Sequence, residues 1–308
     1  MDIQFTEEQE LLRASIQRLL HDQYAFDARR KIVASDEGFS RRHWTALADL
    51  GLCAAPFDES VGGLGGGALA TMIVMQEFGR HLVVEPYFET VVLAGGLIAE
   101  LGSEAQQAHL EEVIGGGVQL AFAHGEPGSR YDLERVATRA RQDGDGWILS
   151  GRKSVVTNGA DADYIVVSAR TAGETGDREG ISLFLVPKGI EGLSARDYPL
   201  AGGGRGAEIA MEDMVLPAEA LLGDAVGRAL AEARFGLGGD AFAFAFADLG
   251  AVRRPPLAGE PGETEVLPGY GLGAQLQTGL GLVGLTYALN PDLPASRGKV
   301  HVRFAVGL

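Results

Sequence analysis

The spacing of apolar residues changes twice along this chain of 308 residues. Apolar side chains recur at helical spacing in residues 1–115, and short runs rich in β-branched and aromatic residues follow in residues 116–224. Residues 225–308 are rich in Gly and alternate over longer runs. The sequence therefore predicts an α+β protein with an N-terminal helical domain, a small β-barrel or β-sandwich domain and a short antiparallel β tail.

Local signals support the helical domain. Thr6 and Gln9 have the spacing of a capping box, and Leu12, Ile16 and Leu20 repeat on one helical face. Gly51 is the expected C-cap of a helix that ends near Leu50. Further helices are predicted around Trp44 to Leu50, Met72 to Gly79, Thr90 to Leu101 and Glu104 to Ile114, with an irregular loop from Pro56 to Gly67.

Five short strands are predicted in the β-domain. Turn signals at residues 144–146 and 173–180 separate them. The predicted strands are Trp147 to Leu149, Ser154 to Thr157, Tyr164 to Ser168, Ile181 to Val186 and Ala207 to Val215.

Charge and cysteine content exclude several classes of protein. A formal net charge of −16 argues against binding to nucleic acid or to an anionic membrane surface. Cys53 is the only cysteine and lies in an apolar stretch, so we expect a buried thiol and no zinc site or internal disulfide. The N-terminal residues do not resemble a secretory signal, and the sequence has no long apolar run that would cross a membrane as a helix. A cytoplasmic location is therefore expected.

Two glycine motifs resemble nucleotide-binding loops, but each lacks a feature that such loops require. Residues 63–68 fit the dinucleotide pattern but follow a predicted loop instead of a strand, and residues 151–154 lack the Gly-Lys pair of a phosphate loop. His124 is a candidate acid or base, although a lone histidine beside small residues more often packs or donates a hydrogen bond. No catalytic triad follows from spacing, so these motifs alone do not name a reaction.

Six segments in the same order resemble the acyl-CoA dehydrogenase family over about 224 residues. Among its members, the chain most resembles the small subunits of pimeloyl-CoA dehydrogenases, through Phe122-Ala123-His124, Tyr131-Asp132 and residues 168–173. The six segments are Phe5 to Leu12, Pro56 to Gly65, Met75 to Arg80, Ala121 to Gly128, Gly151 to Gly159, and Gly206 to Glu208 with the residues up to Gly223.

The resemblance implies FAD as the cofactor and an acyl-CoA or dicarboxylyl-CoA thioester as the substrate, which is dehydrogenated at its α,β carbons. It places the flavin between two segments of the β-domain, whose backbone and hydroxyl groups contact the ring. The implied residues are Phe122, Ala123, His124 and Gly125 on the first segment, and Val155 and Thr157 on the second.

Three positions depart from the family pattern. Gly125 replaces a Thr or Ser, which removes one expected hydrogen bond to the flavin, and Val155 replaces a Trp that packs on the ring. Tyr131 replaces a Ser at a substrate or phosphate contact and is the candidate substrate residue.

The C-terminal part departs further from the family. The family's third domain is a helical bundle that carries the catalytic glutamate, part of the flavin diphosphate site and the oligomer interface. Residues after 230 lack that helical pattern. Glu126 and Glu232 are nearby acids, but neither matches the position of the family's base, so no catalytic residue is assigned. The expectation is a truncated protein that is inactive alone and that has a large subunit or a second copy of itself as partner.

The tail resembles the final strands of outer-membrane β-barrels of the surface-antigen type. The alternating runs are Ala241 to Ala247, Leu272 to Leu282 and Val300 to Leu308. Three strands do not close a barrel, so the favoured interpretation is a fused reading frame with a junction near residues 225–235. Two alternatives to the dehydrogenase stay open: a folded remnant or subunit without flavin, and a fragment of an outer-membrane barrel.

Overall fold

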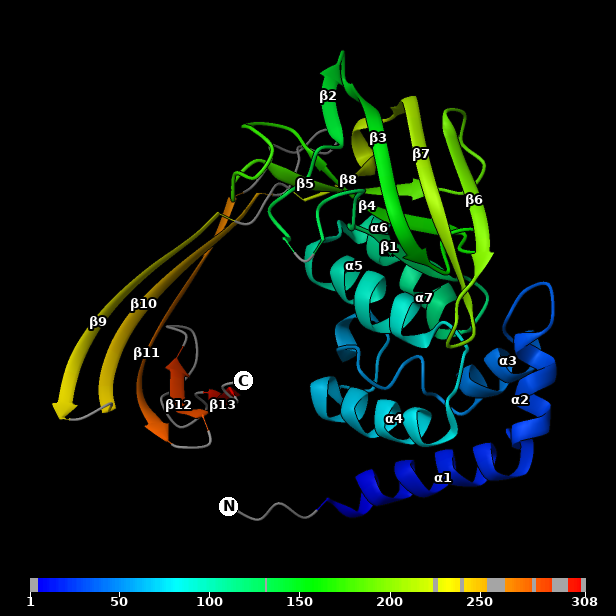
Figure 1. Cartoon of the computed structure of the whole chain (residues 1–308), viewed down its shortest axis with the longest axis horizontal. Helices are drawn as coiled ribbons and strands as arrows, with labels where there is room; N and C mark the ends of the chain where they lie inside the picture. The colour runs from blue at the N-terminus through cyan, green and yellow to red at the C-terminus, as the bar shows by residue number, and fades with distance from the viewer. Residues whose placement is uncertain are drawn as a thin grey trace. The chain divides into compact units, whose positions relative to one another are not determined.

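The computed structural model describes residues 5–130, 132–223, 227–238, 241–253, 264–278, 281–289 and 299–305. It divides the chain into two compact units, Met1–Gly223 and Asp224–Leu308 (Figure 1). Each unit is described by itself below.

The first part of the N-terminal unit is helical, as predicted. Within the described residues, no helix has both the length and the apolar character that crossing a membrane requires. The elements are α1 (Glu7–Gln23), α2 (Phe26–Val33), α3 (Arg41–Asp49), the 3-10 helix η1 (Glu59–Val61), α4 (Gly67–His81), the π-helix η2 (Phe88–Gly95), α5 (Gly96–Leu101), α6 (Glu104–Gln107) and α7 (His109–Ile114).

The predicted helix signals are confirmed. Thr6 and Gln9 form a complete capping box at the start of α1, and Ile16 and Leu20 are buried on its inner face. At the end of α3, Gly51 follows the C-cap residue with a φ of 78°, a left-handed conformation that glycine adopts without steric cost.

The prediction of a regular helix from Thr90 to Leu101 is wrong over its first half. The chain forms the π-helix η2 there and returns to α-helical geometry at Gly96. A Cβ on Gly95 would lie 2.7 Å from the carbonyl oxygen of Thr90 and 2.8 Å from the Phe57 ring. The wider turn thus lies where glycine permits a close approach, which hydrophobic spacing does not reveal.

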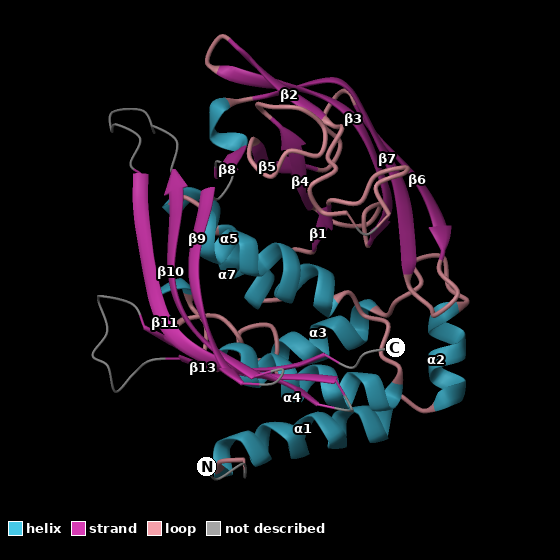
Figure 2. Ribbon diagram, turned by 60° about the vertical axis from the view of Figure 1, so that its left-hand side comes forward, coloured by secondary structure: helices cyan, strands magenta, loops and turns pink. Residues whose placement is uncertain are grey.

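The second part of the N-terminal unit is an eight-stranded sheet. Its central path runs β6-β7-β3-β2-β4-β5-β8, and β1 pairs in parallel with β4. In Figures 1 and 2, α5 and α7 lie between this sheet and α4. The strands are β1 (Leu120–Ala123), β2 (Arg139–Asp143), β3 (Gly146–Thr157), β4 (Tyr164–Arg170), β5 (Ile181–Pro187), β6 (Leu193–Pro199), β7 (Arg205–Leu216) and β8 (Leu221–Gly223).

Two details of the predicted β-domain need correction. The separate strands expected at residues 147–149 and 154–157 are one strand, β3, which is irregular opposite β7. In addition, β2 and β6 were not predicted, because most of their side chains are exposed and their sequences lack a buried apolar face.

Two hydrophobic cores stabilise this unit. The first packs the helices against one face of the sheet and includes Trp44 and Leu47 together with Leu120, Val166 and Leu222. The second lies within the β-domain. Cys53 is fully buried in the first core, as predicted, and burial raises the pKa of its thiol to about 12.

The C-terminal unit is an antiparallel sheet, with strands in the order β13-β12-β11-β10-β9. The expectation of three strands is wrong, because the run from Leu272 to Leu282 is divided between two strands and because β9 lacks strict alternation. The strands are β9 (Gly227–Gly238), β10 (Ala241–Arg253), β11 (Thr264–Thr278), β12 (Gly281–Leu289) and β13 (Lys299–Ala305). Residues 225–226 of the expected junction and 306–308 of the last run lie outside the described residues. The resemblance to outer-membrane strands stays a prediction.

Candidate functional site

The two segments expected to flank a flavin lie side by side. The amide of Ser154 on β3 donates to the carbonyl of Gly125, just after β1, at 2.8 Å. Phe122 on β1 and His124 just after it are half-buried, and their rings stack with centroids 5.7 Å apart at an interplanar angle of 18°. Ala123 lies between them and is fully buried on the opposite face of the strand, so only its backbone could contact a ligand on the side of the two rings.

Gly125 is exposed and has room for a larger side chain. A Cβ at this position would contact only the carbonyl oxygen of Ser154, at 3.4 Å. A threonine would therefore fit at this position, so packing does not require a glycine there.

Val155 has an unusual backbone conformation. Its φ of 53° is a genuine outlier for a β-branched residue, and its side chain is 60% exposed. Ser154 and Val155 together oppose Glu208 on β7, which makes a β-bulge. Strained residues and bulges of this kind concentrate at functional sites, where they re-aim side chains.

The substrate residue implied by the resemblance, Tyr131, lies outside the described residues. Its role stays a prediction.

A buried polar cluster lies directly behind β1. The Nζ of Lys153 donates to Glu126 Oε1 at 2.7 Å, to Ser168 Oγ at 3.0 Å and to the carbonyl of His124 at 3.2 Å. All three ammonium donors are thus satisfied. Because Ser168 accepts from Lys153, its own proton is free for His124 Nδ1, 3.0 Å away, which favours a neutral imidazole with its proton on Nε2.

The pKa shifts of this cluster agree with that assignment. Burial lowers the pKa of Lys153 to about 8, although Glu126 opposes the shift. Burial and the charge of Lys153 lower the pKa of His124, which keeps the ring neutral at pH 7. Burial raises the pKa of Glu126, but hydrogen bonds from Lys153 and Thr138 and the charge of Lys153 outweigh burial and lower it overall.

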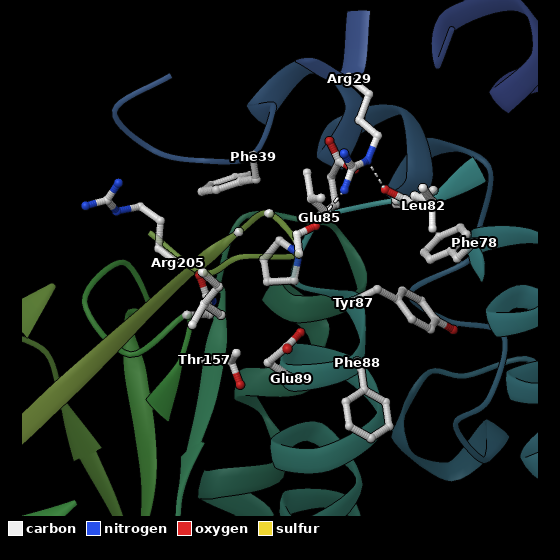
Figure 3. A pocket seen from close by; sticks show the side chains of 18 of the residues that line it. Arg29, Phe39, Phe78, Leu82, Glu85, Tyr87, Phe88, Glu89, Thr157 and Arg205 are labelled. Atoms are coloured by element: carbon white, nitrogen blue, oxygen red, sulfur yellow. Dashed lines mark hydrogen bonds between the residues drawn. The ribbon is translucent and has the colours of Figure 1, made fainter. Parts of the chain in front are cut away.

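A pocket of about 370 Å³ lies between the helices and the sheet (Figure 3). Thr157, at the end of β3, is part of its wall, as are Asn158 and the turn before β7. Apolar side chains of the helical part line much of it, among them Phe39, Met75, Phe78 and Phe88. Of the expected flavin residues, Thr157 is the one that reaches this pocket.

Glu89 on η2 also faces this pocket (Figure 3). It is half-buried, and burial raises the pKa of its carboxyl despite opposing hydrogen bonds from its own backbone and from Thr157. Sequence reasoning missed this acid, because the helix predicted there began only at Thr90 and a single glutamate beside it carries no motif. Lys153 was missed as well, because it lies in residues 151–154, which were considered only as a phosphate loop. A buried lysine needs an acidic partner, and this need could have pointed to the ion pair.

Two family models match consecutive parts of this unit. The model described as acyl-CoA dehydrogenase, N-terminal domain, matches residues 6–116, and the model described as acyl-CoA dehydrogenase, middle domain, matches residues 121–215. The chain belongs to the acyl-CoA dehydrogenase family. The two matched ranges correspond to the helical part and to the sheet of the N-terminal unit.

Curated acyl-CoA dehydrogenases match the same region. The mitochondrial long-chain specific enzyme of Sus scrofa is 33% identical over 236 residues, which cover 71% of this chain and 52% of that protein. The probable acyl-CoA dehydrogenase YngJ of Bacillus subtilis is 29% identical over 230 residues and is covered to 60%. The chain therefore spans little more than half the length of these relatives.

Solved structures share this fold. The ChsE4-ChsE5 complex from Mycobacterium tuberculosis superposes with a TM-score of 0.64 at 27% identity, over 72% of this chain and 58% of that one. A glutaryl-CoA dehydrogenase from Mycobacterium smegmatis, determined in complex with FADH2, has a TM-score of 0.62 at 23% identity over 71% and 56% of the two chains, which shows the fold alone.

The candidate site of this chain offers groups that suit a flavin ring. Gly125 and Val155 leave an exposed strip of backbone and apolar side chain, and Thr157 adds a hydroxyl two residues after Val155. A flat, largely apolar ring with polar edges needs such a surface with a few polar groups at its border.

Proposed function

We propose that this chain binds FAD against Gly125, Val155 and Thr157 and takes part in the α,β-dehydrogenation of an acyl-CoA thioester. One observation carries the proposal. In a chain of this family, the strained, exposed bulge at Val155 lies two residues before Thr157, which also lines an apolar pocket. A flavin on the bulge and an acyl group in the pocket would then meet at Thr157.

Each residue has a defined part in this proposal. Bound FAD would supply the acceptor for the hydride that leaves the β-carbon, while a base removes the α-proton. Thr157 holds the polar edge of the ring through its hydroxyl, and Val155 packs on the face of the ring. The pocket walls exclude water from the acyl chain, which favours the close approach that hydride transfer requires.

The base is assigned to a second polypeptide. Glu126 directly follows the first expected flavin segment, but it accepts hydrogen bonds from Lys153 and from the amides of Ala137 and Thr138. Its oxygens are thus engaged in the interior. We propose that a large subunit supplies the base and the rest of the flavin site, and that this chain is inactive alone.

Titration of the purified chain with FAD, followed by flavin fluorescence, tests the proposal. Thr157→Val keeps the shape but removes the hydroxyl, so we expect FAD binding to weaken about tenfold. Gly125→Thr restores the hydroxyl that the family pattern has at this position, and we expect it to tighten binding. Thr45→Val is the control, because its hydroxyl bonds within α3.

The contrary result has a definite meaning. If wild-type protein and Gly125→Thr both leave FAD free at micromolar concentrations while circular dichroism shows a folded chain, the proposal is wrong. The departures at Gly125 and Val155 favour a second candidate in that case, a folded subunit that does not bind flavin.

A further inference from the structure

We infer that the pocket beside Thr157 takes acyl groups without a second negative charge, and that Glu89 excludes dicarboxylyl thioesters. The inference rests on the proposed function and narrows its substrate class. Of the two substrate classes that the resemblance implies, an acyl-CoA or a dicarboxylyl-CoA thioester, it selects the first.

The two arginines at the pocket already have partners. Arg29 donates from Nε to the carbonyl of Leu82 and from a terminal nitrogen to that of Gly202, both at 2.6 Å. Arg205 donates to the carboxylate of Asp197 at 2.6 Å. Arg29 thus joins α2 to the end of α4 and to the turn between β6 and β7, so its reorientation toward a ligand would break one contact between helices and one between a helix and the sheet.

The acids at the pocket differ in their partners. Glu37 pairs with Arg41 at 2.8 Å. Glu85 is buried and directs one oxygen to the amide of Ser40 at 3.3 Å, with His43 Nδ1 at 3.6 Å. Among the ion pairs within residues 5–130 and 132–223, none involves Glu89.

Glu89 lies where it would distinguish neutral acyl groups from acyl groups with a second carboxylate. In Figure 3, its carboxyl group lies on the same side of the pocket as Thr157, and Arg29 lies on the opposite side. An acyl group that enters beside Thr157 therefore meets Glu89 first. Burial weakens the solvent screening of this carboxylate, so a second carboxylate brought beside it would be strongly repelled.

A neutral acyl chain meets no such obstacle. It packs against Met75, Phe78 and Phe88, which line the same pocket. Because burial already raises the pKa of Glu89, an apolar neighbour can be accommodated by protonation of the carboxyl, whereas a ligand carboxylate would still lack a cationic partner there.

Calorimetric titration of the FAD-saturated full chain tests this inference with two unreactive thioethers of CoA. One carries a hexyl group, and the other carries a 5-carboxypentyl group of similar length; free CoA gives the baseline. We expect the hexyl compound to bind at least about tenfold more tightly than the carboxylate. This wild-type comparison decides the inference even where a variant fails to fold.

Two variants assign the effect to its residue. Glu89→Gln should reduce the preference to within about threefold, because it removes the charge and keeps the shape. Glu112→Gln, on the exposed side of α7, removes a charge far from the ligand and should leave the preference as in the wild type.

The outcomes separate the inference from the proposed function. Equal or tighter binding of the carboxylate overturns the inference alone and indicates that Arg29 turns toward the ligand. An unchanged preference in Glu89→Gln also overturns it. If neither thioether binds better than free CoA, the proposed acyl-CoA function fails together with the inference.

Discussion

At the scale of single residues, the ion pair of Glu126 and Lys153 holds the polar cluster behind β1. Removal of one partner leaves the other buried without its counter-charge, which costs about 3–5 kcal/mol. We therefore expect Lys153→Met to lower the free energy of unfolding by this amount, measured by urea denaturation at pH 7. Arg178→Met, which breaks an exposed pair with Glu134, should cost less than about 1 kcal/mol.

The double variant and the pH dependence test the same pair. Glu126→Leu with Lys153→Met removes both charges and should recover much of the loss. In the wild type, the pKa of Glu126 lies below its ordinary 4.5, so the unfolded chain takes up protons first as the pH falls. The stability from Glu126 should thus be present above pH 4.5 and be lost below it. A Lys153→Met variant as stable as the wild type would contradict this account.

Arg170 is a buried charged residue whose partners are backbone carbonyls, in contrast to the ion pair of Lys153. It is 1% exposed and donates to the carbonyls of Glu134, Val136, Asp177 and Glu179. One side chain thereby fixes the segment before β2 and the loop between β4 and β5. The sequence could not predict this, because the partners are backbone atoms and leave no pattern of residue types.

At the scale of elements, two adjacent glycines test the π-helix. A Cβ on Gly95 would lie 2.7 Å from a backbone oxygen, whereas a Cβ on Gly96 meets no atom within 4 Å. We expect Gly95→Ala to lower the free energy of unfolding by about 1–3 kcal/mol. Gly96→Ala should raise it by about 0.5–1 kcal/mol, because alanine favours the helix. Thermal unfolding of the two variants measures both effects, and equal signs would show that η2 does not have this geometry.

The elements also show how far the sequence predicts this fold. Hydrophobic spacing and capping residues predicted most helices of residues 5–114, because helical signals are local. Strands with a buried face, such as β4 and β5, were predicted as well, whereas the exposed β2 and β6 were not. The expected flavin segments rested on resemblance. Glu89 and the partners of Lys153 became visible only when distant segments were brought together.

At the scale of the whole molecule, the N-terminal unit should fold without the other. The buried side chains of its two hydrophobic cores extend from Ile16 to Leu222, so this unit has an extensive core of its own. We therefore expect a chain ended after Gly223 to unfold at the same temperature as this unit in the full protein, within about 4 °C, which corresponds to about 1–2 kcal/mol for a unit of this size. Differential scanning calorimetry measures both. A shortened chain without a cooperative transition would show that the C-terminal unit is required.

The last strand of the N-terminal unit determines when the first helices can finish folding during synthesis. Leu222 belongs to the core that holds Trp44 and Leu47, and the Gln106 amide donates to the carbonyls of Glu219 and Leu221 at 2.7 and 3.3 Å. A nascent chain on the ribosome therefore lacks part of the wall of its helical core until β8 has emerged. Until then the apolar faces of the helices can bind chaperones. The helical part and the β part of this unit therefore finish folding together, after both have been synthesised.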